Sequence, residues 1–469
     1  MSGRIKKNTY FVSVGQISQM VMAFILIPFA TRYLGPEGFG IYALASSIMF
    51  FVLLANDLGL NTFVTREVAR DTSNAGPYYS NSLTAKLIFI LADAVFLALF
   101  VKIFNYSEEA NSAILIFAIY GILTSFVQLN TGIFRAHERM EFETIVVVFE
   151  KLITTGAGIF VLTMGWGVLA LCWVFVVGGL ISVLLSTSFV HKHFCKVKVA
   201  FDFHLGKRLL RSSLPFGISL CLANLYHNVG IILLSALQDA EVVGWFAAGA
   251  RLLKFVGIIP TILSIAIFPA LSREMIQSKD RFADLFTKGF KYICFLAIPL
   301  IAGIIIMAED ITKVMFGSEF ENSIVVLRIL AWAGGLIFFN IFLAGLFNAS
   351  NNQKKLVIIQ IFATILNVLL NLILIPRFAH VGAAISMVAT EGVIFVTCIV
   401  FAFQRISRLQ EFAFVLKAVA ATVVMSACSL LLKNFNIFAV VILSTAIYFS
   451  ALYIFRGFVL EEILLLKKQ

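Results

Sequence analysis

Two cations, Arg251 and Lys254, interrupt the otherwise apolar stretch GWFAAGARLLKFVGIIPTILSIAIFP. Because they are three residues apart, a helix places both side chains on one face. Arginine binds phosphate oxygens through two parallel N–H donors, and lysine adds a compact positive charge. The spacing therefore favours a cationic patch that receives an anionic substrate. The alternative is an ion pair that only holds helices together, with Glu391, Asp93 or Glu150.

Further charged residues lie inside apolar stretches, at different depths. An ionised side chain at the centre of a bilayer is costly, so such residues usually face a bundle interior or a wet cavity. Asp93 and Glu391, like Arg251 and Lys254, lie ten or more residues deep in their stretches, near the midplane, and Glu150 and Lys151 are intermediate. Residues closer to a stretch end can extend their charged groups to the interface. These are Lys86, Asp57, Arg328 and Lys417.

Two spacings complete the candidate set. Lys86 and Asp93 are seven residues apart and share a helix face. Asn367 and Asn371, four apart, would form with Glu391 a polar cluster for a coupling cation, although we favour interhelical hydrogen bonding for them. The predicted substrate-binding residues are Arg251, Lys254, Lys86 and Lys151. The predicted ion-coupling residues are Asp93, Glu391, Glu150, Asn367 and Asn371.

Composition indicates which solvent these stretches meet. The chain is 61% hydrophobic and 13% charged, with a mean hydropathy of +0.99, whereas soluble domains average about 45–50% apolar and roughly 25% charged residues. No soluble core could bury its 48 phenylalanines. The 6 cysteines lack CxxC spacing, which argues against disulfides, a zinc site or an iron–sulfur cluster. The sequence therefore indicates a multi-pass integral membrane protein.

The expected fold is all-α, with about 14 transmembrane helices. A spanning helix needs about 20 mostly apolar residues, and breaks rich in charge, Gly, Pro or Asn separate the candidates. The predicted spans are residues 8–31, 38–59, 81–104, 110–134, 143–164, 166–190, 212–236, 242–270, 287–308, 323–347, 354–377, 380–403, 411–432 and 436–455.

Lysine and arginine are distributed unevenly over the predicted loops. They recur in the loops on the side of the N-terminus, for example at 191–211 and 273–291, and are sparse in the opposite loops. Positive residues favour the cytoplasmic side, so we expect both termini in the cytoplasm. The net charge of +11 then reflects orientation and contact with membrane lipid head groups. No nucleic-acid partner is expected.

A weak internal repeat relates the two halves of the chain. IFRAHERMEFETIVVVFEKL and LFNASNNQKKLVIIQIFATIL each combine Phe-x-Ala, a polar turn and a new helix. The offset covers an even number of helices, which predicts parallel repeats that hold a substrate between them, as in many transporters. We expect two pseudo-symmetric six-helix lobes around a central cavity, at residues 1–211 and 212–403. Two C-terminal helices and a cytoplasmic tail follow at 404–469.

Motifs for catalysis and nucleotide binding are missing from the sequence. It contains no GxxxxGK[ST], so the chain carries no P-loop of its own. It also shows no nucleophile–base pair and no large polar loop for catalysis. We therefore expect neither an enzyme nor a bound cofactor.

Several segments resemble one family, in order along nearly the whole chain. They are ATRYLGPEGFGIYALASS, NDLGLNTFVTREVAR, EVVGWFAAGARLLKFVGIIPTILSIAIFPALSRE, DITKVMFGSEFENSIVVLRILAW and NQKKLVIIQIFATILNVLLNLILIPRFAHVGAAISMVATEG. They are similar to the polysaccharide biosynthesis proteins, the O-antigen and oligosaccharide-lipid flippases of the multidrug/oligosaccharidyl-lipid/polysaccharide exporter superfamily. A single element such as Leu-Gly-Pro-Glu is a weak signal, whereas the ordered set is a strong one.

The resemblance implies a flippase in a bacterial inner membrane. Its substrate would be an undecaprenyl-diphosphate-linked oligosaccharide, and its partners a polysaccharide polymerase and a chain-length regulator. Related lipid-linked precursor flippases have a cationic cavity with an arginine on the eighth helix, and Arg251 is the matching position. The first span has Arg32 only at its outer end, unlike the arginine-rich first helices of the cell-wall lipid flippase. That difference argues against a peptidoglycan precursor.

Two other functions remain open. A cation-coupled multidrug exporter of the same superfold would need acids in its cavity for cationic drugs, and Lys86, Lys151, Arg251 and Lys254 argue against it. A membrane-bound enzyme, such as an O-acetyltransferase or a polymerase, would need a catalytic histidine or aspartate in a large loop, which the sequence lacks.

Overall fold

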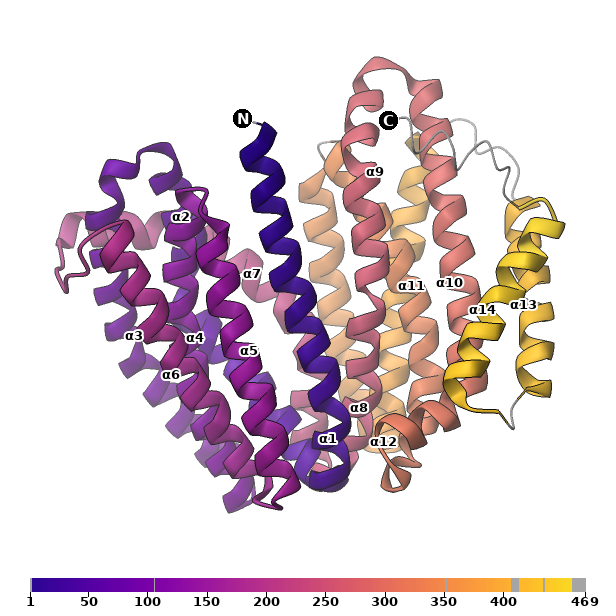
Figure 1. The fold of residues 1–469 in the computed structure, drawn as a ribbon, viewed down its shortest axis with the longest axis horizontal. Coiled ribbons are helices and arrows are strands. Elements are labelled where there is room, and N and C mark those ends of the chain that lie inside the picture. The colour runs from indigo at the N-terminus through magenta and orange to yellow at the C-terminus, as the bar shows by residue number, and fades with distance from the viewer. Residues whose placement is uncertain (1, 105, 351, 406–412, 433–434, 458–469) are drawn as a thin grey trace. The chain divides into compact units, whose positions relative to one another are not determined.

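The computed structural model describes residues 2–457 apart from 105, 351, 406–412 and 433–434. Every regular element in this part of the chain is an α-helix or a short 3-10 helix (Figure 1). The all-helical fold predicted from composition is therefore confirmed.

The elements follow in chain order. They are α1 (Ser2–Asp57), α2 (Leu60–Arg70), η1 (Thr72–Asn74), α3 (Ala75–Phe104), α4 (Glu108–Ala136), α5 (Met140–Thr163), α6 (Gly167–His193), α7 (Phe203–Leu237), α8 (Ala240–Val256), α9 (Ile258–Gln277), α10 (Lys279–Met315), η2 (Ser318–Phe320), α11 (Ser323–Ala349), α12 (Gln353–Arg405), α13 (Ala413–Leu431) and α14 (Ile437–Ile454).

Eleven helical stretches among the described residues are long and apolar enough to cross a membrane. Two of them, in α1 and α12, each contain two of the predicted spans. The backbone leaves the helix at Gly35, with φ 66°, and at Ala379, with φ 47°, so each long element is two helices joined at a kink. The predicted short turn at 164–166 lies between α5 and α6.

The predicted span 242–270 covers most of α8 and the first part of α9, and Ala240–Ser264 form one stretch long and apolar enough to cross a membrane. α8 and α9 meet at Gly257. Pro260 lies in the first turn of α9 and has no N–H, so the carbonyl four residues before it lacks its helical partner. Arg251 and Lys254 lie in the last two turns of α8, near the middle of the stretch Ala240–Ser264.

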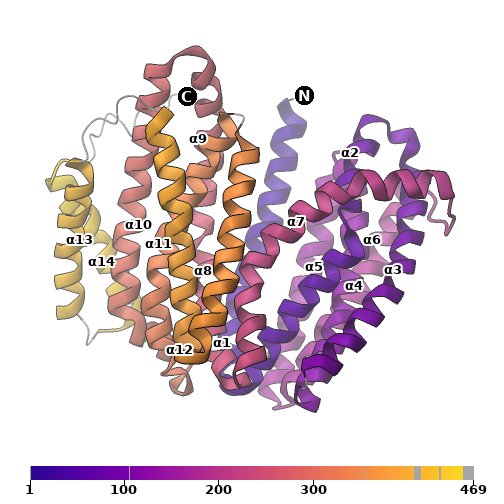
Figure 2. The ribbon, with the colours of Figure 1, turned by 180° about the vertical axis from the view of Figure 1, so that it is seen from behind.

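The chain divides into two compact units, Met1–Ala247 and Ala248–Gln469. The boundary falls within α8, further along the chain than residue 211, where the sequence predicts a lobe boundary. In the first unit, α1 packs against α4 and α5, and α6 packs against both of these helices (Figures 1 and 2).

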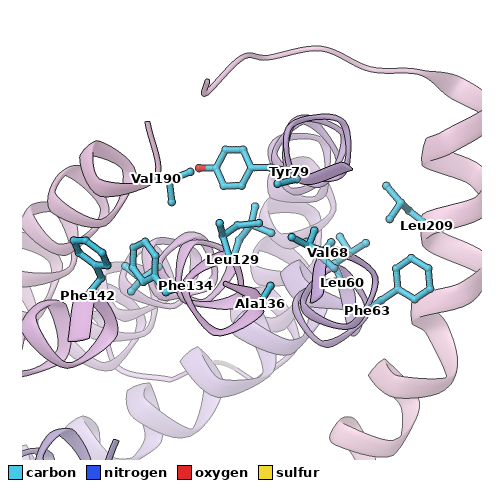
Figure 3. Packing of buried hydrophobic residues seen from close by; sticks show 14 of the residues in the cluster. Leu60, Phe63, Val68, Tyr79, Leu129, Phe134, Ala136, Phe142, Val190 and Leu209 are labelled. Atoms are coloured by element: carbon cyan, nitrogen blue, oxygen red, sulfur yellow. The ribbon is translucent and has the colours of Figure 1, made fainter. Parts of the chain in front are cut away.

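The short helix α2 closes one end of the first unit. Leu60, Phe63 and Val68 recur at helical spacing and are buried, while the charged residues of α2 face outward. Figure 3 shows these side chains in one core with Leu129 of α4 and Leu209 of α7. The amphipathic pattern of α2 therefore positions the first part of α7 on the same core.

Helix packing explains the last glycine of the segment LGPEGFG, which is Gly40. After the kink, α1 crosses α8 so closely that a Cβ on Gly40 would overlap the carbonyl oxygen of Ala240. A Cβ on Gly244 would likewise overlap the carbonyl oxygen of Pro36. Only glycine permits such close approaches. Gly40 faces Ala240 and Gly244 faces Pro36, and the two contacts fit together because the residues are four apart on each helix.

In the second unit, α10 packs against α9, α11 and α13, and α11 packs against α12. The C-terminal pair α13 and α14 forms a layer on α10. Tyr448 of α14 fixes this layer, because its hydroxyl donates to the backbone oxygen of Phe295 at 2.9 Å.

Candidate functional site

Lys86 of α3 is fully buried in the first unit. Its Nζ donates to Asp57 Oδ1 at 3.0 Å, to the backbone oxygen of Asn56 at 3.2 Å and to Ser125 Oγ at 2.5 Å. A lysine ammonium group has three N–H donors, so each donor has an acceptor here. Lys86 and Asp57 are 0% and 4% exposed, and the expectation that their charged groups extend to the interface is wrong.

Asn56 connects this ion pair to Asp93. Its Nδ2 donates to Asp93 Oδ2 at 2.9 Å and to the backbone oxygen of Lys86 at 3.2 Å. Its Oδ1 accepts from Ser125 Oγ at 3.0 Å. The two residues predicted to share a face of α3 therefore contact the same asparagine. We call Asn56, Asp57, Lys86, Asp93 and Ser125 the N-unit cluster.

Glu150 and Lys151 of α5 form a second ion pair in the first unit. Lys151 Nζ lies 2.8 Å from Glu150 Oε1. The hydroxyl of Tyr120 on α4 donates to the same oxygen at 2.7 Å and lies 3.3 Å from Lys151 Nζ. The side chains of Lys151 and Glu150 are 18% and 9% exposed. A predicted substrate-binding residue and a predicted ion-coupling residue are thus partners.

Asn367 and Asn371 lie together in the first half of α12. Asn371 Nδ2 donates to Asn367 Oδ1 at 2.9 Å, and Asn367 Nδ2 donates across the kink to Thr390 Oγ1 at 3.1 Å. Asn371 is 1% exposed, yet its Oδ1 atom accepts no hydrogen bond. A buried amide oxygen of this kind can accept a hydrogen bond or coordinate a hard cation.

Glu391, which follows Thr390, is hydrogen-bonded to a residue on α11. Asn340 Nδ2 donates to Glu391 Oε2 at 2.6 Å and to the Glu391 backbone oxygen at 3.1 Å. Asn340 Oδ1 is buried and accepts no hydrogen bond. We call the set Asn340, Asn367, Asn371, Thr390 and Glu391 the C-unit cluster.

The cations of α8 are placed by the helix that carries them. Arg251 is partly exposed in the second unit. Lys254 follows three residues later on α8, but its side chain lies outside the described residues. Both positions precede the break at Gly257.

Sequence reasoning did not single out several members of these clusters. Asn56 and Asn340 left a detectable signal, because each is an amide inside an apolar helix, in VLLANDLG and LIFFNIFL. Ser125, Tyr120 and Thr390 left none, since hydroxyl residues are common in spanning helices and often bond to their own backbone.

Apolar helices with charged and amide clusters buried inside them define a multi-pass membrane protein with polar sites within its spans. The chain belongs to the family of polysaccharide biosynthesis proteins, whose family model matches residues 5–275. This confirms the resemblance found in the sequence. A second family model, MatE, matches residues 215–373.

Named relatives are similar to this chain in sequence, and a solved structure is similar to it in fold. A putative O-antigen transporter of Escherichia coli (strain K12) is 23% identical over 410 residues, covering 86% of this chain and 98% of that protein. A probable low-salt glycan biosynthesis flippase of Haloferax volcanii is 22% identical over 371 residues, covering 78% and 76%. The lipid II flippase MurJ, in an inward closed conformation, has a similar fold, with a TM-score of 0.76 at 15% identity over 95% of this chain and 98% of that chain.

Proposed function

We propose that this chain is a flippase for an undecaprenyl-diphosphate-linked oligosaccharide, an O-antigen or similar repeat unit. It moves this substrate from the cytoplasmic to the periplasmic leaflet for polysaccharide assembly, where a polymerase and a chain-length regulator are its partners. The observation that carries the proposal is the family match over residues 5–275. The chemistry agrees with it, because a diphosphate and a glycan cannot cross hydrocarbon unaided.

The proposed architecture has fourteen spans in a bacterial inner membrane, as two six-helix lobes around a central cavity and two C-terminal helices. The bias of lysine and arginine toward alternate loops supports cytoplasmic termini. Reporter fusions after Lys196 and Lys279 should then be cytoplasmic, and fusions near Asp239 and Glu319 periplasmic. An inverted result at two or more of these sites would refute the arrangement.

Arg251 and Lys254 are the proposed diphosphate-binding residues. Arginine and lysine complement the charge of a diphosphate, and Arg251 is partly exposed. Lys151 is a secondary candidate, because its side chain is 18% exposed although Glu150 pairs with it. Lys86 is not included, since its ammonium group already donates to three acceptors inside the first unit.

The decisive experiment is transport by purified Arg251→Ala protein in vesicles that contain a labelled lipid-linked oligosaccharide. Losing one charge-assisted contact weakens substrate affinity by a factor of about 30–150, and lipid-linked repeat units should accumulate in the inner leaflet of cells. Arg251→Lys should keep part of the activity, because the charge remains without the paired donors. Arg328→Ala, at an exposed arginine of α11, is the matched control.

Two outcomes would contradict the diphosphate role. Normal transport by well-folded Arg251→Ala protein would exclude it directly. The other outcome is loss of folded protein in Arg251→Ala that is rescued when the charges of Arg251 and of Glu391, Asp93 or Glu150 are reversed together. That result would show that Arg251 only holds helices together.

Energy coupling is proposed at the buried acids and amides, because the sequence has no nucleotide-binding motif. The C-unit cluster offers the carboxylate of Glu391 and the buried amide oxygens of Asn340 and Asn371. Asp93 is the candidate in the first unit. A proton or a sodium ion fits either acid, and collapse of the corresponding gradient should slow transport.

The second candidate function is cation-coupled multidrug export, which the MatE family match over residues 215–373 favours. In the first unit, however, Asp57 and Glu150 are paired with lysines, which leaves them poorly suited to bind a cationic drug. Vesicles that move a cationic dye but not the labelled lipid-linked oligosaccharide would establish drug export and exclude the flippase.

A further inference from the structure

Exposed cations crowd the segment that joins α6 to α7. They are Lys192, Lys196, Lys198, Lys207, Arg208 and Arg211. The same segment contains one acid, Asp202, whose Oδ1 accepts from the backbone N–H groups of His204 and Leu205 at 2.8 and 3.1 Å. That carboxylate therefore caps the start of α7, and the segment presents a strongly positive surface.

Large apolar side chains are exposed beside these cations. Val199 is 69% exposed, Phe203 68%, Leu214 47% and Phe201 44%. Each would be unfavourable in bulk water, whereas cations alternating with apolar residues suit the boundary between head groups and acyl chains.

The segment is fixed to the first unit. The backbone N–H of Asp202 donates to Asn81 Oδ1 of α3 at 2.8 Å, and Thr84 Oγ1 donates to the backbone oxygen of Ala200 at 3.2 Å. Leu209 is 2% exposed and belongs to the core shown in Figure 3. The exposed side chains are thus presented by an anchored backbone.

The direction of the segment differs from that of the spanning helices. Figure 2 shows the first part of α7 running across the ends of α3, α4 and α6 instead of along them. These three helices are long and apolar enough to cross a bilayer, and an element that runs across them would lie along the membrane surface. Amphipathic helices with this orientation bury an apolar face at the head-group level.

We propose that residues 192–214, which we call the α6–α7 platform, form a binding surface for anionic phospholipid head groups. The cations contact lipid phosphates, and Val199, Phe203 and Leu214 insert among the upper acyl chains. Each lysine or arginine near an anionic surface strengthens binding about fivefold. The proposal does not depend on which substrate the chain carries.

The test is lipid binding by the purified full chain, measured by native mass spectrometry during titration with phosphatidylglycerol or phosphatidylcholine. The wild-type chain should prefer phosphatidylglycerol. A triple variant, Lys207→Gln, Arg208→Gln and Arg211→Gln, should bind phosphatidylglycerol roughly 100-fold more weakly and phosphatidylcholine unchanged. The matched control removes the same charge elsewhere, with Lys102→Gln, Lys313→Gln and Arg377→Gln, and should keep the preference.

Three results would overturn the proposal. One is an equal loss in the platform and control variants, and another is a wild-type chain without preference for phosphatidylglycerol. The third is a platform variant that keeps this preference but loses binding of undecaprenyl diphosphate, since the platform would then bind substrate. Phe203→Ser supplies an independent check, because it should weaken binding of both phospholipids several-fold. Unchanged binding of both phospholipids would refute the proposed insertion of the apolar side chains among the acyl chains.

Discussion

The N-unit cluster and the C-unit cluster both bury charged and amide groups among apolar helices, but they satisfy them differently. In the N-unit cluster, each N–H of Lys86 has an acceptor, and Asp57 supplies the opposite charge. In the C-unit cluster, the Oδ1 atoms of Asn340 and Asn371 are buried and accept no hydrogen bond. The Lys86 ammonium group thus has all its hydrogen bonds, whereas the C-unit cluster has two amide oxygens without a donor.

Buried polar groups can therefore have two different roles, to stabilise the packing of helices or to bind an ion. A matched ion pair fixes the packing of its helices and is strongly destabilised when one partner is removed. Buried oxygen acceptors without a partner lower stability, but amide oxygens can coordinate a metal cation, and the neighbouring Glu391 carboxylate can bind a proton or a cation. We therefore expect substitutions of the Lys86–Asp57 ion pair to affect folding, and substitutions in the C-unit cluster to affect coupling.

The largest effect is expected for Lys86→Met. Methionine preserves much of the volume but leaves the Asp57 carboxylate buried without its cation, which should lower the free energy of unfolding by about 3–5 kcal/mol. The thermal midpoint and the yield of folded protein in detergent measure this loss. Lys102→Met, at an exposed position of the same helix, should leave both unchanged.

A second variant tests whether the lost partner is the cause. Adding Asp57→Asn to Lys86→Met removes the uncompensated charge and should recover most of the lost midpoint. A wild-type midpoint for Lys86→Met alone would show that the ion pair does not stabilise the first unit.

A smaller loss is expected for Lys151→Met. Glu150 loses its cation in this variant as well, but the Lys151 side chain is 18% exposed and the Tyr120 hydroxyl still donates to Glu150. The loss should lie between the values for buried and surface pairs, about 2 kcal/mol. Thermal midpoints of Lys151→Met and Lys86→Met under identical conditions test the order, and a greater loss for Lys151→Met would contradict it.

Removing one hydroxyl group from each cluster compares the contribution of a charged and of a neutral hydrogen bond to stability. Ser125→Ala removes an acceptor from the Lys86 ammonium group and a donor to Asn56, and the bond to the charged group alone contributes about 1.5–3 kcal/mol. Thr390→Val removes a neutral acceptor from Asn367, for which about 0.5–1.5 kcal/mol is expected. Equal shifts of the thermal midpoint for these matched variants would mean that charge does not distinguish the two clusters.

Composition was sufficient to predict helices throughout, because a chain with 61% hydrophobic residues cannot bury them in a soluble core. The boundary between α8 and α9 at Gly257 was not predicted, since mean apolarity along 242–270 does not reveal where a backbone hydrogen bond is lost. Pro260 carried that information in the sequence. Hydropathy thus predicts where a span lies better than whether it is continuous.

Candidate residues were found by their charge, but their partners were not. Lys86 and Asp93 were paired by a spacing of seven residues on one helix, whereas the contacts run through Asn56 on α1. Glu391 was grouped with Asn367 and Asn371, yet it bonds to Asn340 on α11. Contacts between helices depend on rotation about each helix axis, and spacing within one helix does not determine that rotation.

The smallest effect on stability and the clearest effect on function are expected for Asn371→Leu. The variant removes two neutral hydrogen bonds, from Asn371 Nδ2 to the backbone oxygen and to Oδ1 of Asn367. Such bonds in membrane proteins average about 0.6 kcal/mol each, and the loss is offset because a buried acceptor without a partner is removed as well. It also removes the Oδ1 acceptor, which can coordinate a cation, so transport should no longer respond to an imposed sodium gradient. Ser429→Ala in the same unit is the matched control, because it removes the bond to Ser444 and should leave the gradient response intact. A full gradient response from folded Asn371→Leu protein would show that both clusters are structural, because the acceptor that distinguishes them would then have no role in coupling.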